Sequence, residues 1–243
     1  MAGNFRDVTE RSFGVPEAVN SGQVGYGIVI DFFAFASQAS GFPVKFVYPS
    51  VTTIVPANVG IVANAPNKAG AEAFVEFLLS PAGQQMLFDP SIRRLPVNPA
   101  IYDKAPAGYP NPFKDPRLNS MVKFDVKKSE VRTNIVDALF DQIITFQLAD
   151  LKQATKTIQT AEAALAKKPH PEAQRLLTEA RTLVSAMPIT EADASASETA
   201  GAFTGTKEKG ARQAELEQKW ASFAKTNYAQ AKTKAEDALK LIR

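Results

Sequence analysis

The spacing of apolar residues changes near the middle of the chain. Up to about residue 120, short apolar runs alternate with turn-forming residues, and the runs 24–30, 44–48 and 59–63 are apolar on both faces. This pattern predicts buried strands of a mostly parallel sheet. Around these strands, helical spacing predicts helices over 17–20, 32–40, 68–79 and 81–88. Short strands that alternate with helices of this length predict an open α/β layer structure.

Local signals support these helix starts. Asp31 stands where an N-cap would stand before an apolar helix, and Asn67 and Ser80 occupy the same position before the next two helices. Pro81 follows Ser80 at the first helical position, where the missing N–H of proline costs nothing. The sequence therefore predicts three capped helices, which begin at residues 32, 68 and 81.

After residue 121 the pattern becomes helical throughout. One apolar stripe runs from 129 to about 166, a second follows through 176–184, and a third extends from about 209 to 242. Three helices with matched stripes can bury one another, so we expect an all-α extension arranged as an antiparallel bundle. The Ala-, Ser- and Thr-rich segment 192–206 predicts a flexible or weakly helical connection.

Composition supports this division at residues 100–123, because most prolines and glycines precede it and most charged residues follow it. We therefore expect two parts, 1–120 and 121–243. A hydrophobic content of 45% and a net charge of +3 are typical of a globular protein that is not inserted in a membrane and does not bind nucleic acid. The first ten residues do not resemble a secretory signal, so a signal for export is expected upstream.

Enzyme signatures are scarce. The chain has one histidine and no cysteine, which excludes a histidine-rich metal site and a thiolate nucleophile. His170 lies between two prolines and is expected to be a solvated loop residue. The Gly25-Tyr26-Gly27 motif leads into a strand rather than a helix, so it does not fit a nucleotide loop. We predict a protein that is not an enzyme and needs no cofactor.

Several residues are candidates for ligand binding. Asp31 ends an apolar strand and begins a helix, where open α/β sheets place ligand-contacting groups, although a plain N-cap would look the same. Thr52 and Thr53 lie in a loop whose hydroxyls suit an anionic or polyhydroxylated ligand, although they could be ordinary turn residues. Tyr26 and the pair Phe32-Phe33 could line a pocket or belong to the core.

Four segments carry a family resemblance: VNSGQVGYGIVIDFFAF, GFPVKFVYP, VGIVANAPNKAGAEAFVEFLLSPAGQQMLF and RRLPVNP. In order and spacing they resemble the later part of extracytoplasmic solute-binding proteins of ABC importers. The branch is the two-lobed type 2 one that handles ferric iron, thiamine, phosphonates and sugar phosphates. The resemblance covers roughly residues 11–98.

This resemblance implies a partial type 2 periplasmic-binding-protein fold in a periplasmic, monomeric protein. It assigns 1–53 to the second lobe, 54–100 to the first lobe and 101–120 to a connection, with a hinge near 53–58. Most of the first lobe would then precede residue 1.

The implied function is capture of a small organic anion for membrane importer subunits. The implied contacts are Tyr26, Asp31, Thr52 and Thr53, with Arg94 pairing a carboxylate or phosphate. Iron-binding members carry adjacent tyrosines where this chain has Phe32-Phe33, and phenylalanine offers no oxygen to iron. A phosphorylated or carboxylated metabolite is therefore expected.

The helical part suggests an alternative. A tail of this length exceeds that of transport-only members and resembles regulatory members that act in phosphoglycerate uptake and signal to a membrane sensor kinase. The chain could therefore be a periplasmic sensor rather than a transport protein.

Overall fold

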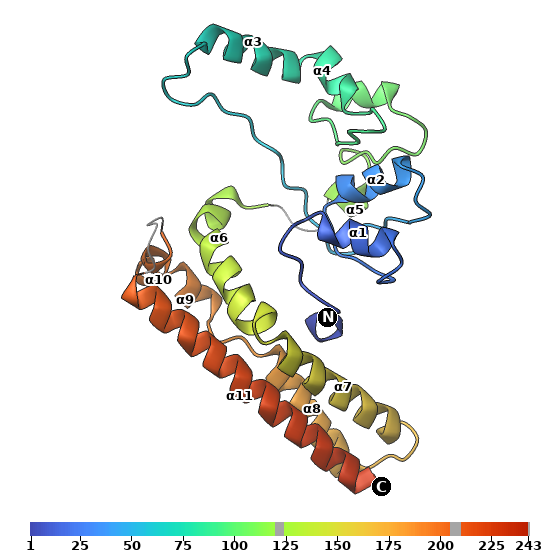
Figure 1. Cartoon of the computed structure of the whole chain (residues 1–243), viewed down its shortest axis with the longest axis vertical. Coiled ribbons are helices and arrows are strands. Elements are labelled where there is room, and N and C mark those ends of the chain that lie inside the picture. The colour runs from blue at the N-terminus through green and yellow to red at the C-terminus, as the bar shows by residue number, and fades with distance from the viewer. Residues whose placement is uncertain (120–123, 205–209, 243) are drawn as a thin grey trace. The chain divides into compact units, whose positions relative to one another are not determined.

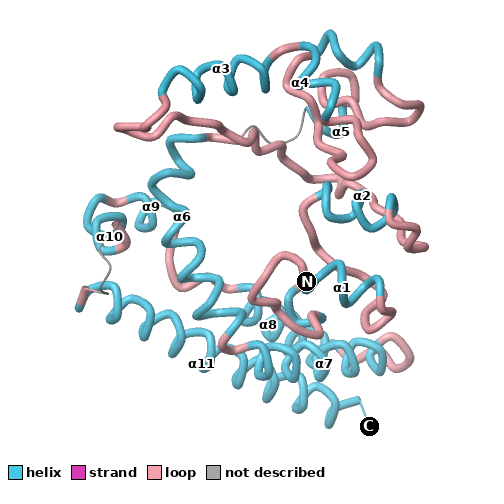
Figure 2. The backbone as a smooth tube through the Cα atoms, turned by 45° about the horizontal axis from the view of Figure 1, so that its top comes forward, coloured by secondary structure: helices cyan, strands magenta, loops and turns pink. Residues whose placement is uncertain are grey.

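The computed structural model describes residues 1–119, 124–204 and 210–242. These residues form helices joined by turns and extended segments, and none of them lies in a β-strand (Figure 1, Figure 2). The chain divides into two compact units. The helical unit comprises Met1–Val8 and Val126–Arg243, and the loop-rich unit comprises Thr9–Asp125.

The helical unit is built on α6 (Val126–Phe140), α7 (Leu148–Leu165), α8 (Pro171–Ser185) and α11 (Ala211–Ile242). Helix α8 runs back along α7, and α11 packs along both (Figure 1). The apolar stripes read from the sequence form one continuous core, whose most buried members include Ile135, Ile158, Leu177, Trp220 and Ala231. The indole of Trp220 stacks on Phe203 with 5.5 Å between ring centroids. The bundle therefore buries each stripe against its neighbours.

The long helix expected over 129–166 is interrupted. A π-helical segment, η3 (Asp141–Thr145), follows α6, and Phe146–Gln147 separates it from α7. The carbonyl of Ile143 in this segment accepts a hydrogen bond of 2.7 Å from the buried hydroxyl of Tyr228 on α11. The wider π turn changes the direction of the chain while Ile143 stays in the core.

The first eight residues belong to the helical unit. The short helix η1 (Ala2–Asn4) packs on α7, where the Gln159 amide donates to Asn4 Oδ1 at 2.9 Å and Lys152 donates to the Arg6 carbonyl at 3.1 Å. Gly3 lies so close to Thr155 that a Cβ atom would overlap that side chain. Nothing in the apolar pattern indicated this long-range contact.

Two short helices, α9 (Glu191–Ser195) and α10 (Ser197–Ala202), occupy most of the segment expected to be a weakly helical connection, and 205–206 lie outside the described residues. Arg132 on α6 donates to the Glu191 carbonyl at 2.9 Å, which holds α9 against α6. The prediction for His170 as a solvated loop residue is right that it lies outside the helix and wrong that it is fully solvated. It is the N-cap of α8, half-buried, and its Nδ1 accepts from the Ala173 N–H at 3.3 Å.

The loop-rich unit contains α1 (Gly14–Asn20), α2 (Asp31–Ala39), α3 (Lys68–Leu79), α4 (Pro81–Met86), η2 (Pro99–Lys104) and α5 (Pro116–Asn119). Helices α1 and α2 pack through Phe13 and Phe33, whose ring centroids are 5.4 Å apart. A second small core joins Phe88 to Ile101 and Tyr102. The caps predicted for α3 and α4 are confirmed, since Asn67 and Ser80 accept hydrogen bonds from Gly70 and Gly83.

The predicted α/β fold is wrong for the described residues, which form helices and no sheet. The runs 24–30 and 44–48 and residues 59–62 are neither helix nor strand, residue 63 lies in a turn, and no other described segment forms a ladder with these runs. Their side chains are largely exposed, with Tyr26 at 97% and Val47 at 78%. An extended segment becomes a strand only when another segment pairs with its N–H and C=O groups. The apolar pattern indicates a tendency to be buried, but it does not supply the partner.

No helix among the described residues is both long enough and apolar enough to cross a membrane.

Candidate ligand-binding site

The carboxylate of Asp31, in the first turn of α2, accepts two hydrogen bonds. Asp31 is the first residue of the helix rather than its N-cap, because the extended Ile30 takes the cap position without a side-chain hydrogen bond. Asp31 Oδ1 accepts from the Phe32 N–H at 2.8 Å, and Oδ2 accepts from the Tyr48 hydroxyl at 2.8 Å. A carboxylate in the first turn is also favoured by the helix dipole. Asp31 is therefore held in one orientation by two donors.

Tyr48 stands against α2 within a row of aromatic rings. The Phe46 ring lies 5.1 Å from Phe35 and 4.8 Å from Tyr48, in edge-to-face contacts. Burial raises the pKa of the Tyr48 hydroxyl well above its ordinary value, and the hydrogen bond to Asp31 and the charge of Asp31 raise it further. Tyr48 consequently remains a proton donor to Asp31 at any physiological pH.

Arg94 lies at the same end of α2. Its guanidinium carbon is 3.3 Å from the centroid of the Phe32 ring, a cation–π contact with the residue that follows Asp31. The Arg94 backbone is held by its N–H, which donates to the Leu87 carbonyl at 3.0 Å, and by its carbonyl, which accepts from Tyr109 at 2.8 Å. The structure thus places the side chain of Arg94 beside the first turn of α2, the turn that contains Asp31.

The other three candidates are not gathered at this turn. The Tyr26 side chain is almost fully exposed in the extended segment before α2. Thr52 is half-buried and Thr53 exposed, and both follow Tyr48 in an extended segment. Of the five residues chosen from the sequence, two therefore share a location.

Sequence reasoning missed Tyr48 and the role of Phe32 as a support for Arg94. A signal for Tyr48 was present, because Phe46 and Tyr48 are two residues apart in an extended run and so project to the same side. No comparable signal linked Phe32 to Arg94, since more than 60 residues separate them in the sequence.

This turn combines a guanidinium, a carboxylate and a hydroxyl. Such a set can bind a ligand that carries an acidic group together with hydroxyl groups. A metal site is not indicated, because the described residues contain no group of three or more His, Asp or Glu side chains able to hold an ion.

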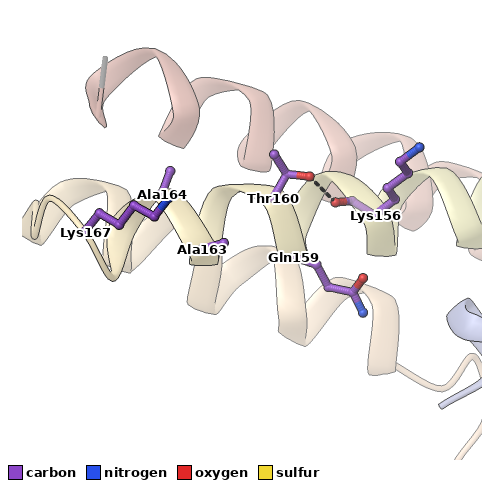
Figure 3. Close-up of a pocket in the computed structure, with 6 residues that line it drawn as sticks. All are labelled: Lys156, Gln159, Thr160, Ala163, Ala164 and Lys167. Atoms are coloured by element: carbon purple, nitrogen blue, oxygen red, sulfur yellow. Dashed lines mark hydrogen bonds between the residues drawn. The ribbon is translucent and has the colours of Figure 1, made fainter.

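Two hollows are lined by other residues than those of this turn. The first lies on α7 in the helical unit and is lined by Lys156, Gln159, Thr160, Ala163, Ala164 and Lys167 (Figure 3). Its polar groups include the Thr160 hydroxyl, which already donates to the Lys156 carbonyl at 2.9 Å. Five of the six residues come from α7, and Lys167 lies in the turn that follows it, so the hollow is lined from one side only. The second lies beside α1 and includes Asn20, whose buried Oδ1 has no hydrogen-bond partner.

Comparison with known proteins gives two results for this chain. Residues 1–123 match a family model described as bacterial extracellular solute-binding protein. Two curated relatives, the phosphoglycerate transport regulatory proteins PgtC of Salmonella typhimurium and Salmonella typhi, are each 33% identical to the chain over 179 residues. No solved structure gives a significant match.

The extent of these matches differs. The similarity to the two relatives covers 73% of this chain and 43% of theirs, so the chain spans less than half of their length. Its 179 residues exceed the stretch covered by the family model. The likeness to the relatives therefore continues into the helical unit.

Proposed function

Because the chain belongs to the bacterial extracellular solute-binding protein family, we propose that it captures a small organic anion outside the cytoplasm and presents it to membrane importer subunits of the ABC type. The ligand in this proposal is a phosphorylated or carboxylated metabolite, and phosphoglycerate is the first compound to test, given the name of the two relatives.

The observation that carries the proposal is the position of Arg94. Its guanidinium lies flat on Phe32 at the first turn of α2, where Asp31 and Tyr48 also meet. A stacked guanidinium keeps its N–H edge available for a carboxylate or phosphate, while the carboxylate of Asp31 suits a ligand hydroxyl.

The mechanism we propose is closure around the ligand. Contacts on both sides of the segment 53–58 would favour a closed state, and a membrane partner would recognise that state. Tyr26, Thr52 and Thr53 remain proposed contacts that join the ligand on closure.

A thermal-shift screen of the full chain tests this function. The compounds are phosphoglycerate, glycerate, a phosphonate, a hexose phosphate and ferric citrate. A true ligand raises the Tm in a concentration-dependent way, because it binds only the folded state. We expect a phosphorylated or carboxylated compound to do so, and Asp31→Asn to weaken the shift while the exposed control Asp103→Asn does not. A shift with ferric citrate alone, or with none of the compounds, contradicts the proposal.

A second candidate function is supported by the likeness that extends past residue 123 into the helical unit, because the relatives are named as regulatory proteins. In this alternative the helical unit contacts a membrane histidine kinase and reports ligand capture. Helix α6 offers two exposed apolar side chains four residues apart, Val136 and Phe140, which form one face.

The two functions respond differently to the paired substitution Val136→Glu with Phe140→Glu. If the helical unit signals, a phosphoglycerate-responsive reporter in a strain lacking its own regulator loses its response, while the ligand-induced Tm shift is retained. If the reporter response persists with these substitutions, signalling through this face is ruled out.

A further inference from the structure

Two consecutive arginines lie in the loop between α4 and η2, and the guanidinium of each lies over an aromatic ring of α2. The guanidinium carbon of Arg94 is 3.3 Å from the Phe32 centroid. That of Arg93 is 5.3 Å from the Phe35 centroid and 5.8 Å from the Tyr109 centroid. Phe32 and Phe35 are three residues apart on one helix, so they share a face, and the two guanidiniums lie along that face.

The backbone that carries these arginines is held in place. Arg93 has a φ of 43°, in the left-handed region that residues other than glycine rarely adopt. Its N–H donates to the Asp89 carbonyl at 2.9 Å. The single proton of the Tyr109 hydroxyl faces two carbonyl oxygens, that of Arg94 at 2.8 Å and that of Leu87 at 3.2 Å, which holds residues 87 and 94 together. Strained backbone maintained by such contacts is often found at functional sites.

Tyr109 is suited to this fixed role. Burial raises the pKa of its hydroxyl to about 12, although the charge of Arg93 acts in the opposite direction and that of Asp31 adds a smaller upward effect. The hydroxyl therefore keeps its proton at neutral pH and continues to donate it to the carbonyls of residues 87 and 94. The loop is fixed before any ligand arrives.

The two arginines differ from several others in the chain. Arg132, Arg175, Arg181 and Arg212 each form an ion pair with a glutamate. Among the residues that the structure describes, neither Arg93 nor Arg94 has an ion-pair partner. Each guanidinium carbon instead lies over an aromatic ring of α2. The N–H edges of the two guanidiniums therefore remain available to a ligand. The side chain of Arg94 is exposed and that of Arg93 is half-buried.

We propose that Arg93 and Arg94 together form the recognition site for the phosphoryl group of a phosphate monoester. Two guanidiniums can direct paired N–H groups at the oxygens of a dianionic phosphate. A carboxylate has only two oxygens, so it can form a bidentate pair with only one of the two guanidiniums. The carboxylate of Asp31 is the negative group of this region, and both of its oxygens already accept hydrogen bonds. This inference rests on the proposed capture of an organic anion. To that proposal it adds Arg93 as a ligand contact and a preference for phosphate over carboxylate.

The test is calorimetric titration of the full chain with phosphoglycerate, glycerate and inorganic phosphate. The variants are Arg93→Gln and Arg94→Gln, and the matched control is Arg11→Gln, which removes the same charge from an exposed turn of the same unit. We expect phosphoglycerate to bind and glycerate to bind at least about tenfold more weakly. Each of the two variants should weaken phosphoglycerate binding by roughly tenfold or more, because a charge-assisted contact is lost, and the control should leave it unchanged.

Arg94→Gln keeps the test decisive if Arg93→Gln fails to fold, because the Arg94 side chain is exposed. Equal binding of phosphoglycerate and glycerate, or parental binding by Arg94→Gln, overturns the phosphate site. Phosphoglycerate binding that neither variant changes would leave the proposed function standing without this site. Binding of inorganic phosphate that needs both arginines, with no binding of any organic compound, would leave the site standing without the proposed function.

Discussion

The helical unit and the loop-rich unit come from one chain, yet they bury their apolar residues to very different extents. In the helical unit the stripe residues meet in one core, and Ile158, Leu177 and Trp220 are at most 1% exposed. In the loop-rich unit the buried groups are small, and much of the apolar sequence lies in exposed extended segments.

The difference follows from where each kind of element finds its hydrogen bonds. A helix pairs its own N–H and C=O groups, so it needs only a neighbouring apolar stripe, and here α7, α8 and α11 supply such stripes to one another. An extended segment leaves its backbone groups unpaired until a second strand is brought to it. Similar apolar content therefore builds a core in one unit and remains exposed in the other.

The largest expected effect is at Trp220. Replacing it by alanine removes a buried ring stacked on Phe203 and should lower the free energy of unfolding by about 3–5 kcal/mol. Urea denaturation followed by circular dichroism at 222 nm measures the change. The contrast is Val47→Ala in the loop-rich unit, where the side chain is exposed and the change should stay below about 0.5 kcal/mol. Equal losses from the two substitutions would contradict the difference between the units.

The next effect concerns Gly3. A Cβ atom at this position would overlap Thr155, so Gly3→Ala should displace η1 from α7 and cost about 1–3 kcal/mol. The matched control is Gly201→Ala in α10, where a Cβ atom meets open space and the change should stabilise the helix by about 0.5–1 kcal/mol. Thermal unfolding of both variants measures the two changes in stability, a decrease for Gly3→Ala and an increase for Gly201→Ala. A neutral Gly3→Ala would mean that residues 1–8 do not pack on α7.

A smaller effect is expected at Tyr228. Removing its hydroxyl in Tyr228→Phe leaves the buried Ile143 carbonyl without this donor and should cost about 1–2 kcal/mol. Hydrogen exchange should increase first at η3 and the start of α7. Tyr26→Phe in the loop-rich unit removes a hydroxyl that water already solvates and serves as the control. No change in exchange near η3 would show that this hydrogen bond does not hold the π turn.

The smallest effect is a response to acid. Hydrogen bonds lower the pKa of Glu172, Glu179 and Glu191, the donors being Arg175, Lys234 and Lys128 respectively. A lowered pKa in the folded state stabilises the fold above the ordinary glutamate pKa, and this contribution disappears as the pH falls through the lowered value. Because all three groups are on the surface, the effect should be modest and reduced by salt.

Trp220 is the only tryptophan and reports on the helical unit, so its fluorescence during thermal unfolding gives the pH profile of that unit. We expect its Tm to fall below about pH 4.5, and the triple change of these glutamates to glutamine to flatten the fall. A profile that is the same in the parent and the triple variant would show that these pairs contribute nothing measurable.

Much of the helical structure could be predicted from the sequence. Helices α3 and α4 begin where Asn67 and Ser80 signalled a cap, because capping is a contact between residues three apart. The stripes of α7, α8 and α11 were read correctly for the same reason, since one face of a helix repeats every three to four residues. The break at Phe146–Gln147 was missed, because the stripe continues across η3.

The candidate site was predicted in part. Asp31 was chosen because it follows an apolar run and starts a helix, both of which are local features. The role of Arg93 could not be found in this way, because its contacts with Phe35 and Tyr109 join distant parts of the chain. Neither residue type nor spacing indicates which aromatic ring a given arginine will cover.

The sequence alone determined where α3 and α4 begin, the apolar stripes that pack α7, α8 and α11 together, and the resemblance that placed the chain in its family. All of these depend on short repeats or on the order of residues. Only the tertiary structure decided that residues 1–8 pack on α7, that the apolar extended segments form no sheet, and that Arg93 and Arg94 lie on α2. Each of these depends on which distant segment comes into contact, and contacts between distant segments are set by packing and backbone pairing rather than by local pattern.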